Sequence, residues 1–547
     1  MRPAALLLAA APLWALSACG STVAATPADA SLDAAPDASM NPDAAPDVAP
    51  DVAPDAPPRV SVVWSPCPLH SEGDGPDAEC ADVAVPLDRA RPTGPNIRVH
   101  VKRYHPEGGR SLRALWMLQG GPGASGWVFE GLSEVMATRF PDVDYYIPDH
   151  RGTGGSTRLG CAAQEADDSE GGLAITEAEW PACIASLRAE HGEGLASFNV
   201  TNAANDLGLL IEATRRDGQR VIVLGASYGT YLAHRYLQLF PRQADGVVFD
   251  STAPPGSNLF EQDADAHEAA RDFFAACGAD SFCASKLGAD PWSVATRLFD
   301  RLRAGHCPMI AVPAAPTHVL FRRAFGSMLM DPSLRAYVPA VVYRTNRCEA
   351  RDIGALRVFM RAITTPQPPN ENLRQWSFPL THNIVLSEFS PTPPPTREAL
   401  AAIREGAVAS RDVTDGLSVN LGRWPVYTPD AFARGWAETD TPVLFLQGGL
   451  DPATLLRKAR VMREHFTRPH QTWVEVPTAT HTVIASSPFI DEAGEPRSCG
   501  TRLLMRFAED PTAPLDTSCV AQVRPIDFTL PNMERTRGLF GGPDAWE

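Results

Sequence analysis

The chain has 547 residues, of which 44% are hydrophobic, and it carries a formal net charge of −17. This length is enough for a main domain with a large insertion. The acidic balance and the lack of a basic stripe argue against nucleic acid as a partner. Much of the acid stands in a segment near the amino end, so the charge says little about a substrate.

Residues 1–18 resemble a bacterial export signal. Arg2 supplies the positive start, and the apolar run over 4–16 is too short to be a permanent membrane helix. The run closes on Leu-Ser-Ala-Cys, which resembles a lipobox and predicts cleavage before Cys19, with lipid on its thiol. A plain secretory signal cut nearby is the alternative. Both interpretations predict export, and the first predicts attachment to a membrane of the cell envelope through the lipid.

Residues 19–58 repeat Ala, Pro and Asp. Such a stretch has little apolar area to bury and repels itself, so we expect an extended tether without a fold.

The ten cysteines after Cys19 are an even number, which fits disulfides formed in an oxidising compartment. No C-x-x-C recurs and no paired histidines flank them, so no metal site is expected. Sequence alone does not fix connectivity. Proximity suggests Cys67 with Cys80, Cys161 with Cys183, Cys277 with Cys283, Cys307 with Cys348, and Cys499 with Cys519.

Short apolar runs predict the strands of the body. In chain order they cover 60–64, 82–87, 97–104, 112–118, 142–147, 221–224, 246–250, 442–447 and 472–476. Helices are predicted over 201–215, capped by Thr201 or Asn202, and over 230–240. Near-continuous apolar strands separated by helices predict an α/β fold, with a mostly parallel sheet covered on both faces.

Between about 254 and 429 the pattern changes to helical segments and proline-rich loops. We interpret this stretch as a mainly helical cap inserted into the sheet domain. The expected organisation is therefore a first core segment over 59–254, a cap over 255–429, and a second core segment over 430–547 that ends with two cysteines.

The pentapeptide over 225–229 (GASYG) has the pattern G-x-S-x-G, and it stands between a predicted strand and a predicted helix. A serine on such a sharp turn leaves no room for side chains two positions to either side. The following helix directs its free N–H groups toward charge that develops near Ser227. The alternative is an ordinary buried turn serine.

A serine nucleophile needs a base and an acid that orients the base. On this fold the chain order is Ser, acid, His. Asp451 follows the predicted strand over 442–447, and His481 follows the last predicted strand. These positions bring all three side chains to one edge of the sheet. Asp250 is the rival acid.

His481 has three rival bases. His234 falls inside the helix after the nucleophile, while His465 and His470 precede the last strand. None of the three has the topology that this fold requires of a base.

The oxyanion needs two backbone N–H donors. One is predicted at Tyr228, directly after the nucleophile. The other is predicted in the loop over 120–123 (GGPG), at Gly121 or Gly123, where glycine lets backbone approach a substrate. A phosphate-binding loop is the rival interpretation, but no lysine follows and no nucleotide motif accompanies it.

These motifs together resemble the prolyl iminopeptidase and tripeptidyl aminopeptidase branch of the α/β-hydrolases. The resemblance rests on GGPG at 120–123, DHRGTGGS at 149–156, GASYGT at 225–230, Asp451 and His481. It implies a helical cap, a Ser-His-Asp mechanism without cofactor or metal, and peptide substrates with free amino ends. Within the second motif, Asp149 and Arg151 are expected to brace the loop. A carboxyl-terminal segment with two cysteines is typical of the secreted branch.

Three positions depart from the family pattern. Gln119 stands where one branch has histidine, Thr480 precedes His481 where glycine is usual, and Leu386 stands where a cysteine often precedes the cap glutamate. That glutamate corresponds here to Glu388, which the resemblance suggests as the anchor for the substrate ammonium group. Its rivals are Glu261, Asp263, Asp265 and Glu268.

The sequence thus predicts an exported serine aminopeptidase that releases single residues or short peptides such as tripeptides. An exported carboxylesterase on the same fold and a non-catalytic surface lipoprotein are the alternatives. Residue preference, the length of the released piece and oligomeric state stay open at this stage.

Overall fold

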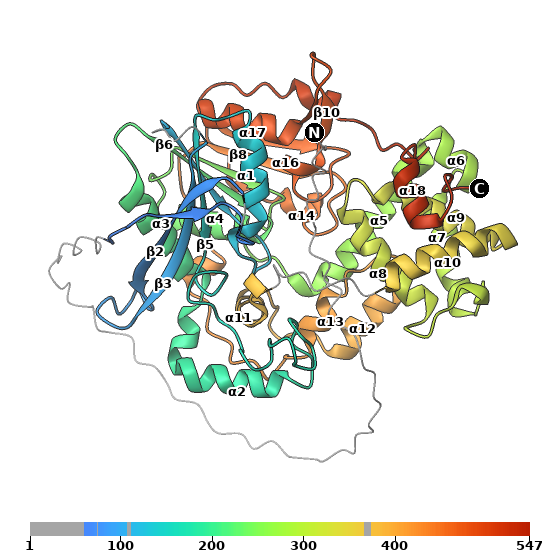
Figure 1. Cartoon of the computed structure of the whole chain (residues 1–547), viewed down its shortest axis with the longest axis horizontal. Coiled ribbons are helices and arrows are strands. Elements are labelled where there is room, and N and C mark those ends of the chain that lie inside the picture. The colour runs from blue at the N-terminus through green and yellow to red at the C-terminus, as the bar shows by residue number, and fades with distance from the viewer. Residues whose placement is uncertain (1–59, 74, 107–110, 366–373) are drawn as a thin grey trace, which may run out of the picture.

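The computed structural model describes residues 60–547 except residue 74 and the ranges 107–110 and 366–373. The expected signal over 1–18, the lipidated Cys19 and the tether over 19–58 lie outside the described residues. The centre of the molecule is a nine-stranded sheet in the order β1-β2-β3-β5-β4-β6-β7-β8-β9 (Figure 1). Its strands are β1 (Ser65–Pro68), β2 (Asp77–Pro86), β3 (Asn96–Tyr104), β4 (Arg113–Leu118), β5 (Val143–Asp149), β6 (Arg220–Ala226), β7 (Gly246–Asp250), β8 (Val443–Gly448) and β9 (Gln471–Val476).

The sheet is antiparallel at one edge and parallel over the rest. Strands β1, β2 and β3 pair antiparallel, and β3 pairs antiparallel with β5. From β5 through β4, β6, β7 and β8 to β9, every neighbour is parallel. In β6, Val221 and Val223 enter one core cluster while Ile222 and Leu224 enter another, as the two-residue period of a strand requires. The central strands of the sheet are therefore buried on both faces, as a parallel sheet between two layers of helices requires.

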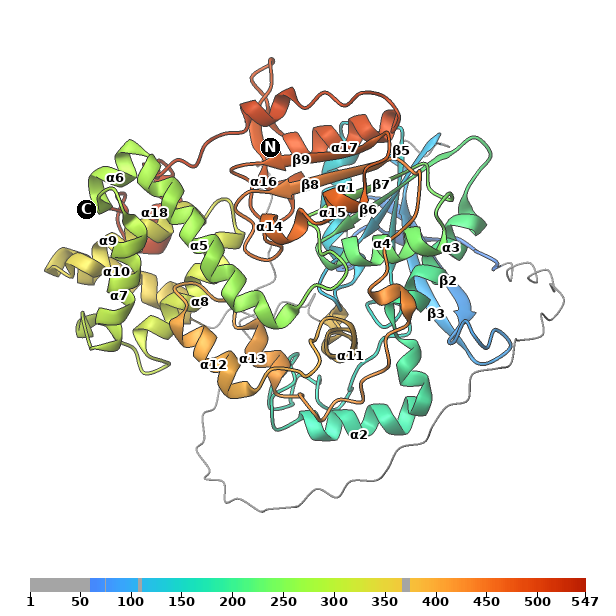
Figure 2. The ribbon, with the colours of Figure 1, turned by 180° about the vertical axis from the view of Figure 1, so that it is seen from behind.

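Helices cover both faces of the sheet (Figures 1 and 2). Helices α3 (Val200–Thr214) and α4 (Tyr228–Leu239) pack in the first cluster, and α1 (Glu130–Ala137) and α17 (Cys499–Glu509) in the second. The cap of α3 differs from the prediction, because the side chain of Asn199 accepts the backbone N–H of Asn202. An extended residue two or three positions before the expected site supplies the cap.

Nine helices lie between β7 and β8 in the part of the chain that is described. They are α5 (Gln262–Ala279), α6 (Ser281–Leu287), α7 (Pro291–Arg303), α8 (Thr317–Met330), α9 (Val338–Arg347), α10 (Ala350–Thr364), α11 (Phe378–Glu388), α12 (Arg397–Gly406) and α13 (Val413–Ser418). Helices α5 to α10 share a hydrophobic cluster of their own, whereas α11 to α13 pack in the cluster of the sheet domain. The cap thus has an outer part and a part continuous with the core.

The carboxyl-terminal segment joins the cap, which differs from the expected second core segment over 430–547. Phe528, Leu530, Phe540 and Trp546 belong to the cluster of α5 to α10. Figures 1 and 2 both show α18 (Met533–Phe540) and the C-terminus beside α6 and α9. The apolar side chains of this segment fill the outer cap, so the chain returns to the cap after crossing the core.

The remaining short elements lie around the sheet. They are α2 (Trp180–His191), α14 (Leu456–Ala459), α15 (Met462–His465), α16 (Val483–Ser486), and the two-stranded β10 (Pro488–Ile490) with β11 (Pro496–Ser498).

The first predicted strand was wrong in position. Residues 60–64 form no strand, and pairing begins at Ser65. Val60, Val62 and Trp64 instead pack against the core cluster without joining the ladder. Alternating apolar side chains there cover the sheet edge, which gives the same sequence pattern as a strand.

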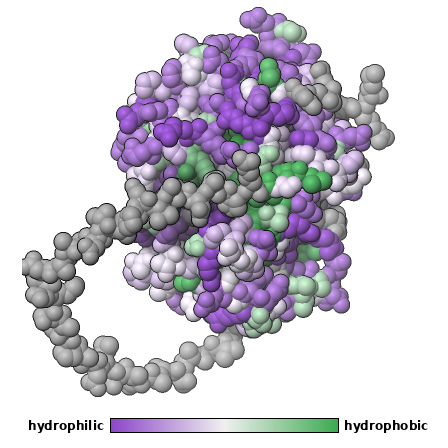
Figure 3. All heavy atoms as spheres, turned by 90° about the vertical axis from the view of Figure 1, so that its left-hand side faces the viewer, coloured by the Kyte–Doolittle hydropathy of each residue, from purple (hydrophilic) through white to green (hydrophobic). Residues whose placement is uncertain are grey.

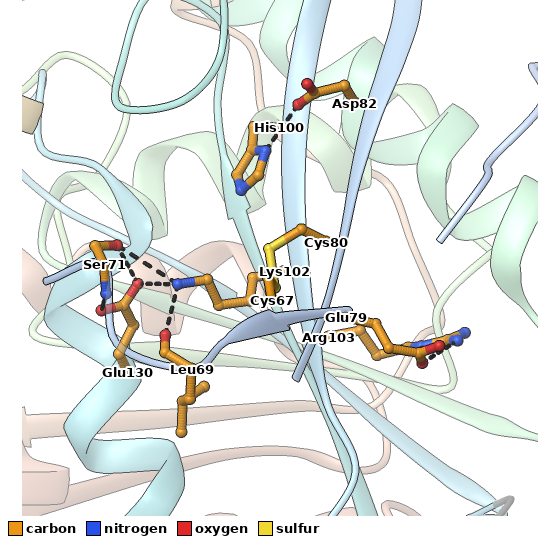
Figure 4. The surroundings of a disulfide bond; sticks show 10 residues. All are labelled: Cys67, Leu69, Ser71, Glu79, Cys80, Asp82, His100, Lys102, Arg103 and Glu130. Carbon is orange, nitrogen blue, oxygen red and sulfur yellow. Dashed lines mark hydrogen bonds and ion pairs between the residues drawn. A yellow bond between two sulfur atoms is a disulfide. The ribbon is translucent and has the colours of Figure 1, made fainter. Parts of the chain in front are cut away.

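The edge formed by β1 and β2 is held by a disulfide and by ion pairs (Figure 4). Cys67 and Cys80 form the disulfide. Nearby, Lys102 Nζ lies 2.6 Å from Glu130 Oε1, with both side chains buried, and donates to the Leu69 carbonyl. A buried ion pair needs such extra hydrogen bonds to offset its desolvation.

Five disulfides join the ten cysteines of the described body. They are the pairs that sequence proximity suggests, 67–80, 161–183, 277–283, 307–348 and 499–519. Figure 3 shows one face that is mostly hydrophilic, with hydrophobic side chains gathered near its middle. No helix in the described ranges is both long and apolar enough to span a membrane.

Candidate active site

Ser227 lies on the turn between β6 and α4 with a positive φ of 57°. A Cβ on Gly225 would meet the carbonyl of Gly229, and a Cβ on Gly229 would meet the carbonyl of Leu118. Both glycines are therefore needed for the chain to turn this sharply. The N–H of Ser227 donates to the Asp250 carbonyl at 2.9 Å, which fixes the turn against the next strand.

Asp451 and His481 form a close pair at the carboxyl ends of β8 and β9. Nδ1 of His481 lies 2.9 Å from Oδ1 and 2.8 Å from Oδ2 of Asp451. The carboxylate also accepts the N–H groups of Ala453 and Thr454 and the Thr454 hydroxyl, at 2.7–2.9 Å. Nδ1–H therefore donates to Asp451, which leaves Nε2 of His481 as the basic nitrogen.

The Asp451 carboxyl is held in its ionised form. Burial raises its pKa, but the charge and hydrogen bond of His481, together with the hydrogen bonds from Thr454, outweigh burial and hold the pKa below its usual value. An ionised partner is what a histidine base requires, because it stabilises the imidazolium formed during proton transfer.

Asp250, the rival acid, does not bond to the imidazole. Its two oxygens accept the N–H groups of Val483 at 2.7 Å and Ile484 at 3.0 Å, directly after the histidine loop. Burial raises its pKa to about 6, against the pull of those two N–H groups. Asp250 thus holds the loop that carries His481, and it acts as a positioning residue.

The rival histidines are not among the residues that line the hollow around Ser227. His234 is buried in α4, where Nε2 accepts the Ala437 N–H at 3.2 Å. His465 stacks on Trp436 with ring centroids 3.5 Å apart, and His470 lies in the turn before β9.

Ser227 and His481 line one cavity of about 870 Å³ beneath the cap. The structure, which describes both residues, has no hydrogen bond between the Ser227 hydroxyl and the imidazole. In ligand-free sites such bonds are often long and tighten when substrate binds. Phe389 from the end of α11 and Met330 from the end of α8 also line the cavity, so both parts of the cap shape it.

Two of the three predicted oxyanion donors line the cavity, and the third does not. Tyr228 and Gly121 line the cavity, and so does Gly120, where an added Cβ would come within 2.8 Å of Cβ of Ser227. Gly123 faces the start of α11 instead, and its carbonyl accepts the N–H of Ser377 at 2.8 Å. The glycine closest to the Ser227 side chain is therefore Gly120, which the sequence did not single out.

The DHRGTGGS segment braces this loop. Asp149 accepts the N–H groups of Gly126 and Gly155, each at 2.7 Å. The buried guanidinium of Arg151 pairs with Asp206 through two hydrogen bonds of 2.7 and 2.8 Å. The ion pair thus joins Arg151 to α3 rather than to Asp149.

Glu388 lies differently from the expected ammonium anchor. It is buried, and its oxygens accept hydrogen bonds from Tyr231 at 2.8 Å, Arg235 at 2.9 Å and Tyr427 at 2.7 Å. Glu388 and Arg235 are 2% and 1% exposed at their side chains. The carboxylate neutralises a buried guanidinium behind the cavity wall formed by Phe389, so it is committed to structural partners.

Replacing Glu388 by glutamine should lower the free energy of unfolding by about 1–3 kcal/mol, because the buried Arg235 then keeps only the more exposed Asp430, 3.6 Å away, as a counter-charge. Thermal or urea unfolding measures this, with the exposed Glu398→Gln on α12 as the matched control. An unchanged melting temperature combined with a raised KM for substrates with free amino ends would instead restore Glu388 as the anchor.

Two of the rival carboxylates face the cavity. Glu261 and Asp265 line it, and Lys458 contacts them at 2.5 and 2.7 Å. Asp263 and Glu268 lie outside its lining.

Two further charged side chains line the cavity without any signal in the sequence. Asp331 follows the end of α8, and Arg411 follows α12. The Arg411 guanidinium makes no hydrogen bond or ion pair with any described residue. Burial lowers its pKa, while the charges of Asp451 and Asp263 act in the opposite direction. Only the folded cap brings these two residues to the cavity that Ser227 lines.

Two family models match the chain. One, described as alpha/beta hydrolase fold, covers residues 113–294, and the other, described as TAP-like protein, covers 414–519. The chain is similar to the tripeptidyl aminopeptidase of Streptomyces lividans, with 33% identity over 218 residues, 36% of this chain and 39% of the relative. It is also similar to the serine protease Hip1 of Mycobacterium bovis, with 28% identity over 257 residues, 42% of this chain and 47% of the relative.

The match thus spans less than half the length of each of these relatives. The first family model contains Ser227 and extends into the first helices of the cap, and the second begins at the last cap helix and contains Asp451 and His481. With the strand order of the sheet and the turn at Ser227, the first model shows the α/β-hydrolase fold, and the TAP-like model and the first relative make the chain similar to tripeptidyl aminopeptidases.

Proposed function

We propose that this protein is an exported serine peptidase that removes residues or short peptides from the free amino ends of peptides. The observation that carries this proposal is the His481–Asp451 pair, with hydrogen bonds of 2.8–2.9 Å, in the wall of the cavity that also exposes Ser227. The names of the two relatives, a tripeptidyl aminopeptidase and a serine protease, support the same class of reaction.

In the proposed mechanism, Nε2 of His481 takes the proton of the Ser227 hydroxyl as its oxygen attacks the scissile carbonyl. Asp451 keeps the proton on Nδ1 and stabilises the imidazolium. The N–H of Tyr228 and an N–H of the loop over 120–121 hold the oxyanion. His481 then protonates the leaving amine, and a water that it activates cleaves the acyl-enzyme.

The cavity supports a substrate longer than one residue. Its volume of about 870 Å³ lies high in the range of roughly 300–1,000 Å³ found for ligand pockets. Three carboxylates line its wall, those of Glu261, Asp265 and Asp331, and each can accept hydrogen bonds from a substrate ammonium group, although Lys458 already pairs with the first two. We propose that these cavity carboxylates, rather than the buried Glu388, recognise the free amino end.

Export is proposed from two features. The segment over 1–18 resembles a signal that ends at the lipidated Cys19, and the body holds five disulfides, which persist in oxidising compartments. The proposed location is the bacterial cell envelope, where residues 19–58 would tether the enzyme to a membrane.

The test is a panel of chromogenic substrates given to the purified body beginning near Arg59. The panel holds aminoacyl and tripeptidyl amides with free and with blocked amino ends, beside short-chain esters, and the Ser227→Ala protein is the control. We expect turnover of the free amides, with the preferred length showing whether one or three residues leave together.

Other outcomes would change the assignment. Turnover of esters without amide cleavage would make the protein a carboxylesterase. Equal turnover of blocked and free amides would contradict the proposed aminopeptidase activity. No turnover of any substrate would favour the non-catalytic lipoprotein and would point to Gln119 and Thr480, the departures from the family pattern.

A further inference from the structure

A second, smaller pocket of about 210 Å³ adjoins the catalytic cavity. Its lining comes from the turn after α8, from the carboxyl-terminal segment between α17 and α18, and from Pro488. Pro332, Ser333 and Arg535 line both hollows, so the pocket opens beside the cavity that contains Ser227. A substrate in the cavity can extend into it.

The pocket is positively charged. Three guanidinium groups line it, those of Arg335, Arg524 and Arg535, together with one carboxylate, that of Asp527. Asp527 is engaged by its own loop, because its Oδ1 accepts the N–H and the hydroxyl of Thr529 at 2.9 and 2.6 Å. The net charge of the lining favours an anion.

Arg335 is the buried arginine of this pocket. It is 5% exposed, and its Nε and Nη1 are enclosed without any hydrogen-bond partner. Burial lowers its pKa to about 10, and Asp331 is the carboxylate whose charge opposes this. Asp331 is not within ion-pair distance of it, and Oδ1 of Asp331 accepts the N–H and hydroxyl of Ser333 at 2.7 and 2.6 Å.

Because Nε and Nη1 are enclosed, a ligand in the pocket would reach Arg335 through its remaining nitrogen, and a bound anion would neutralise the buried positive charge. The second arginine is already oriented, since Nη1 of Arg535 donates to the Ser333 carbonyl at 3.1 Å and its other donors stay available. A planar guanidinium fork matches a carboxylate through two parallel hydrogen bonds. The size of the pocket fits such a group with little else attached.

We propose that this arginine pocket, lined by Arg335, Arg524 and Arg535, binds a carboxylate of the peptide substrate, the free carboxyl end of a short peptide. This rests on the proposed function, which places a peptide in the adjoining cavity. The enzyme then recognises both ends of its substrate, with cavity carboxylates at the ammonium end and the arginine pocket at the carboxyl end. Short peptides with two free ends, the products of endopeptidases, are the substrate class that follows.

The test measures binding to the catalytically inactive Ser227→Ala protein by titration calorimetry. Three versions of one short peptide are compared: a free carboxyl end, an amidated end, and an amidated end with an internal glutamate. The free acid should bind at least ~10-fold tighter than the amide, as expected for a charge-assisted bidentate contact. The same advantage in the glutamate peptide alone would assign the pocket to an acidic side chain and overturn the choice of the carboxyl end.

Arg335→Met in the Ser227→Ala background should remove the preference for the free acid. Its melting temperature should stay level or rise, because the change removes an unpaired buried charge, whereas a purely structural Arg335 would lose stability. Arg537→Met, on α18 but outside the pocket lining, is the matched control and should keep the preference. If Arg335→Met does not fold, Arg535→Gln tests the same preference from a more exposed position.

Equal binding of acid and amide, or a preference that survives in Arg335→Met, would overturn the inference. Turnover by the wild-type body separates this from the proposed function. Cleavage of the free acid and the amide at equal efficiency would contradict the carboxylate pocket and leave the proposed peptidase activity intact. Failure to cleave either peptide would contradict the peptidase activity. Binding of the peptides could still be measured in Ser227→Ala.

Discussion

Replacing Ser227 by alanine should lower kcat/KM for peptide amides by on the order of ~10³ or more. The reason is that the hydroxyl is the attacking group of the proposed mechanism, and no neighbouring side chain can replace it on the turn between β6 and α4. The fold should be unaffected, because the structure gives the hydroxyl no hydrogen bond and the turn is held by backbone contacts such as Ser227 N–H to the Asp250 carbonyl. Progress curves with the best substrate of the panel measure the loss.

Two controls make the result specific. Ser285→Ala, at an exposed position of α6, should keep full activity and full stability. A fluorophosphonate probe should label the wild-type protein on Ser227 and should leave Ser227→Ala unlabelled. Substantial amide turnover by Ser227→Ala, at an unchanged melting temperature, would show that another group performs the attack and would remove the serine mechanism.

The sequence predicts the fold well wherever a local pattern of residues is compatible with only one local structure. Strands β4 to β8 are buried on both faces, so their apolar runs are nearly continuous, and their position, like that of the half-buried edge strand β9, was found to within one or two residues. The turn at Ser227 was found because steric exclusion fixes its two glycines. Chain order then located Asp451 and His481, because parallel strands end at one edge.

The sequence predictions fail at positions whose surroundings are formed by segments far away in the chain. Glu388 carries the family pattern, but Arg235, 153 residues earlier, occupies its carboxylate in the folded chain. In sequence Gly123 looks like an oxyanion glycine, but in the folded chain it faces the start of α11. The carboxyl-terminal segment has no local signal for returning to the cap, since its apolar residues fit either domain. In each case a long-range contact overrides a local pattern.

The second large effect is expected at Asp451, and it differs from the effect expected at Asp250. Asparagine at 451 should lower kcat by about 10³–10⁴-fold while leaving the fold in place. An amide can present its NH₂ to Nδ1 of His481, which stabilises the tautomer that has its proton on Nε2 and removes the base. The N–H groups of Ala453 and Thr454 can still donate to the remaining amide oxygen, so stability should fall only slightly.

Asparagine at 250 should behave differently, because Asp250 acts on the loop and not on the proton. Its two oxygens each accept one N–H, from Val483 and Ile484, and an amide can satisfy only one of them. We expect a loss of stability of about 1–3 kcal/mol from the orphaned N–H, with a fall in kcat well below that of Asp451→Asn. Thermal unfolding and kcat measured on both variants separate the two roles. If Asp250→Asn lost activity as severely as Asp451→Asn at unchanged stability, the acid of the triad would have to be reassigned to the end of β7.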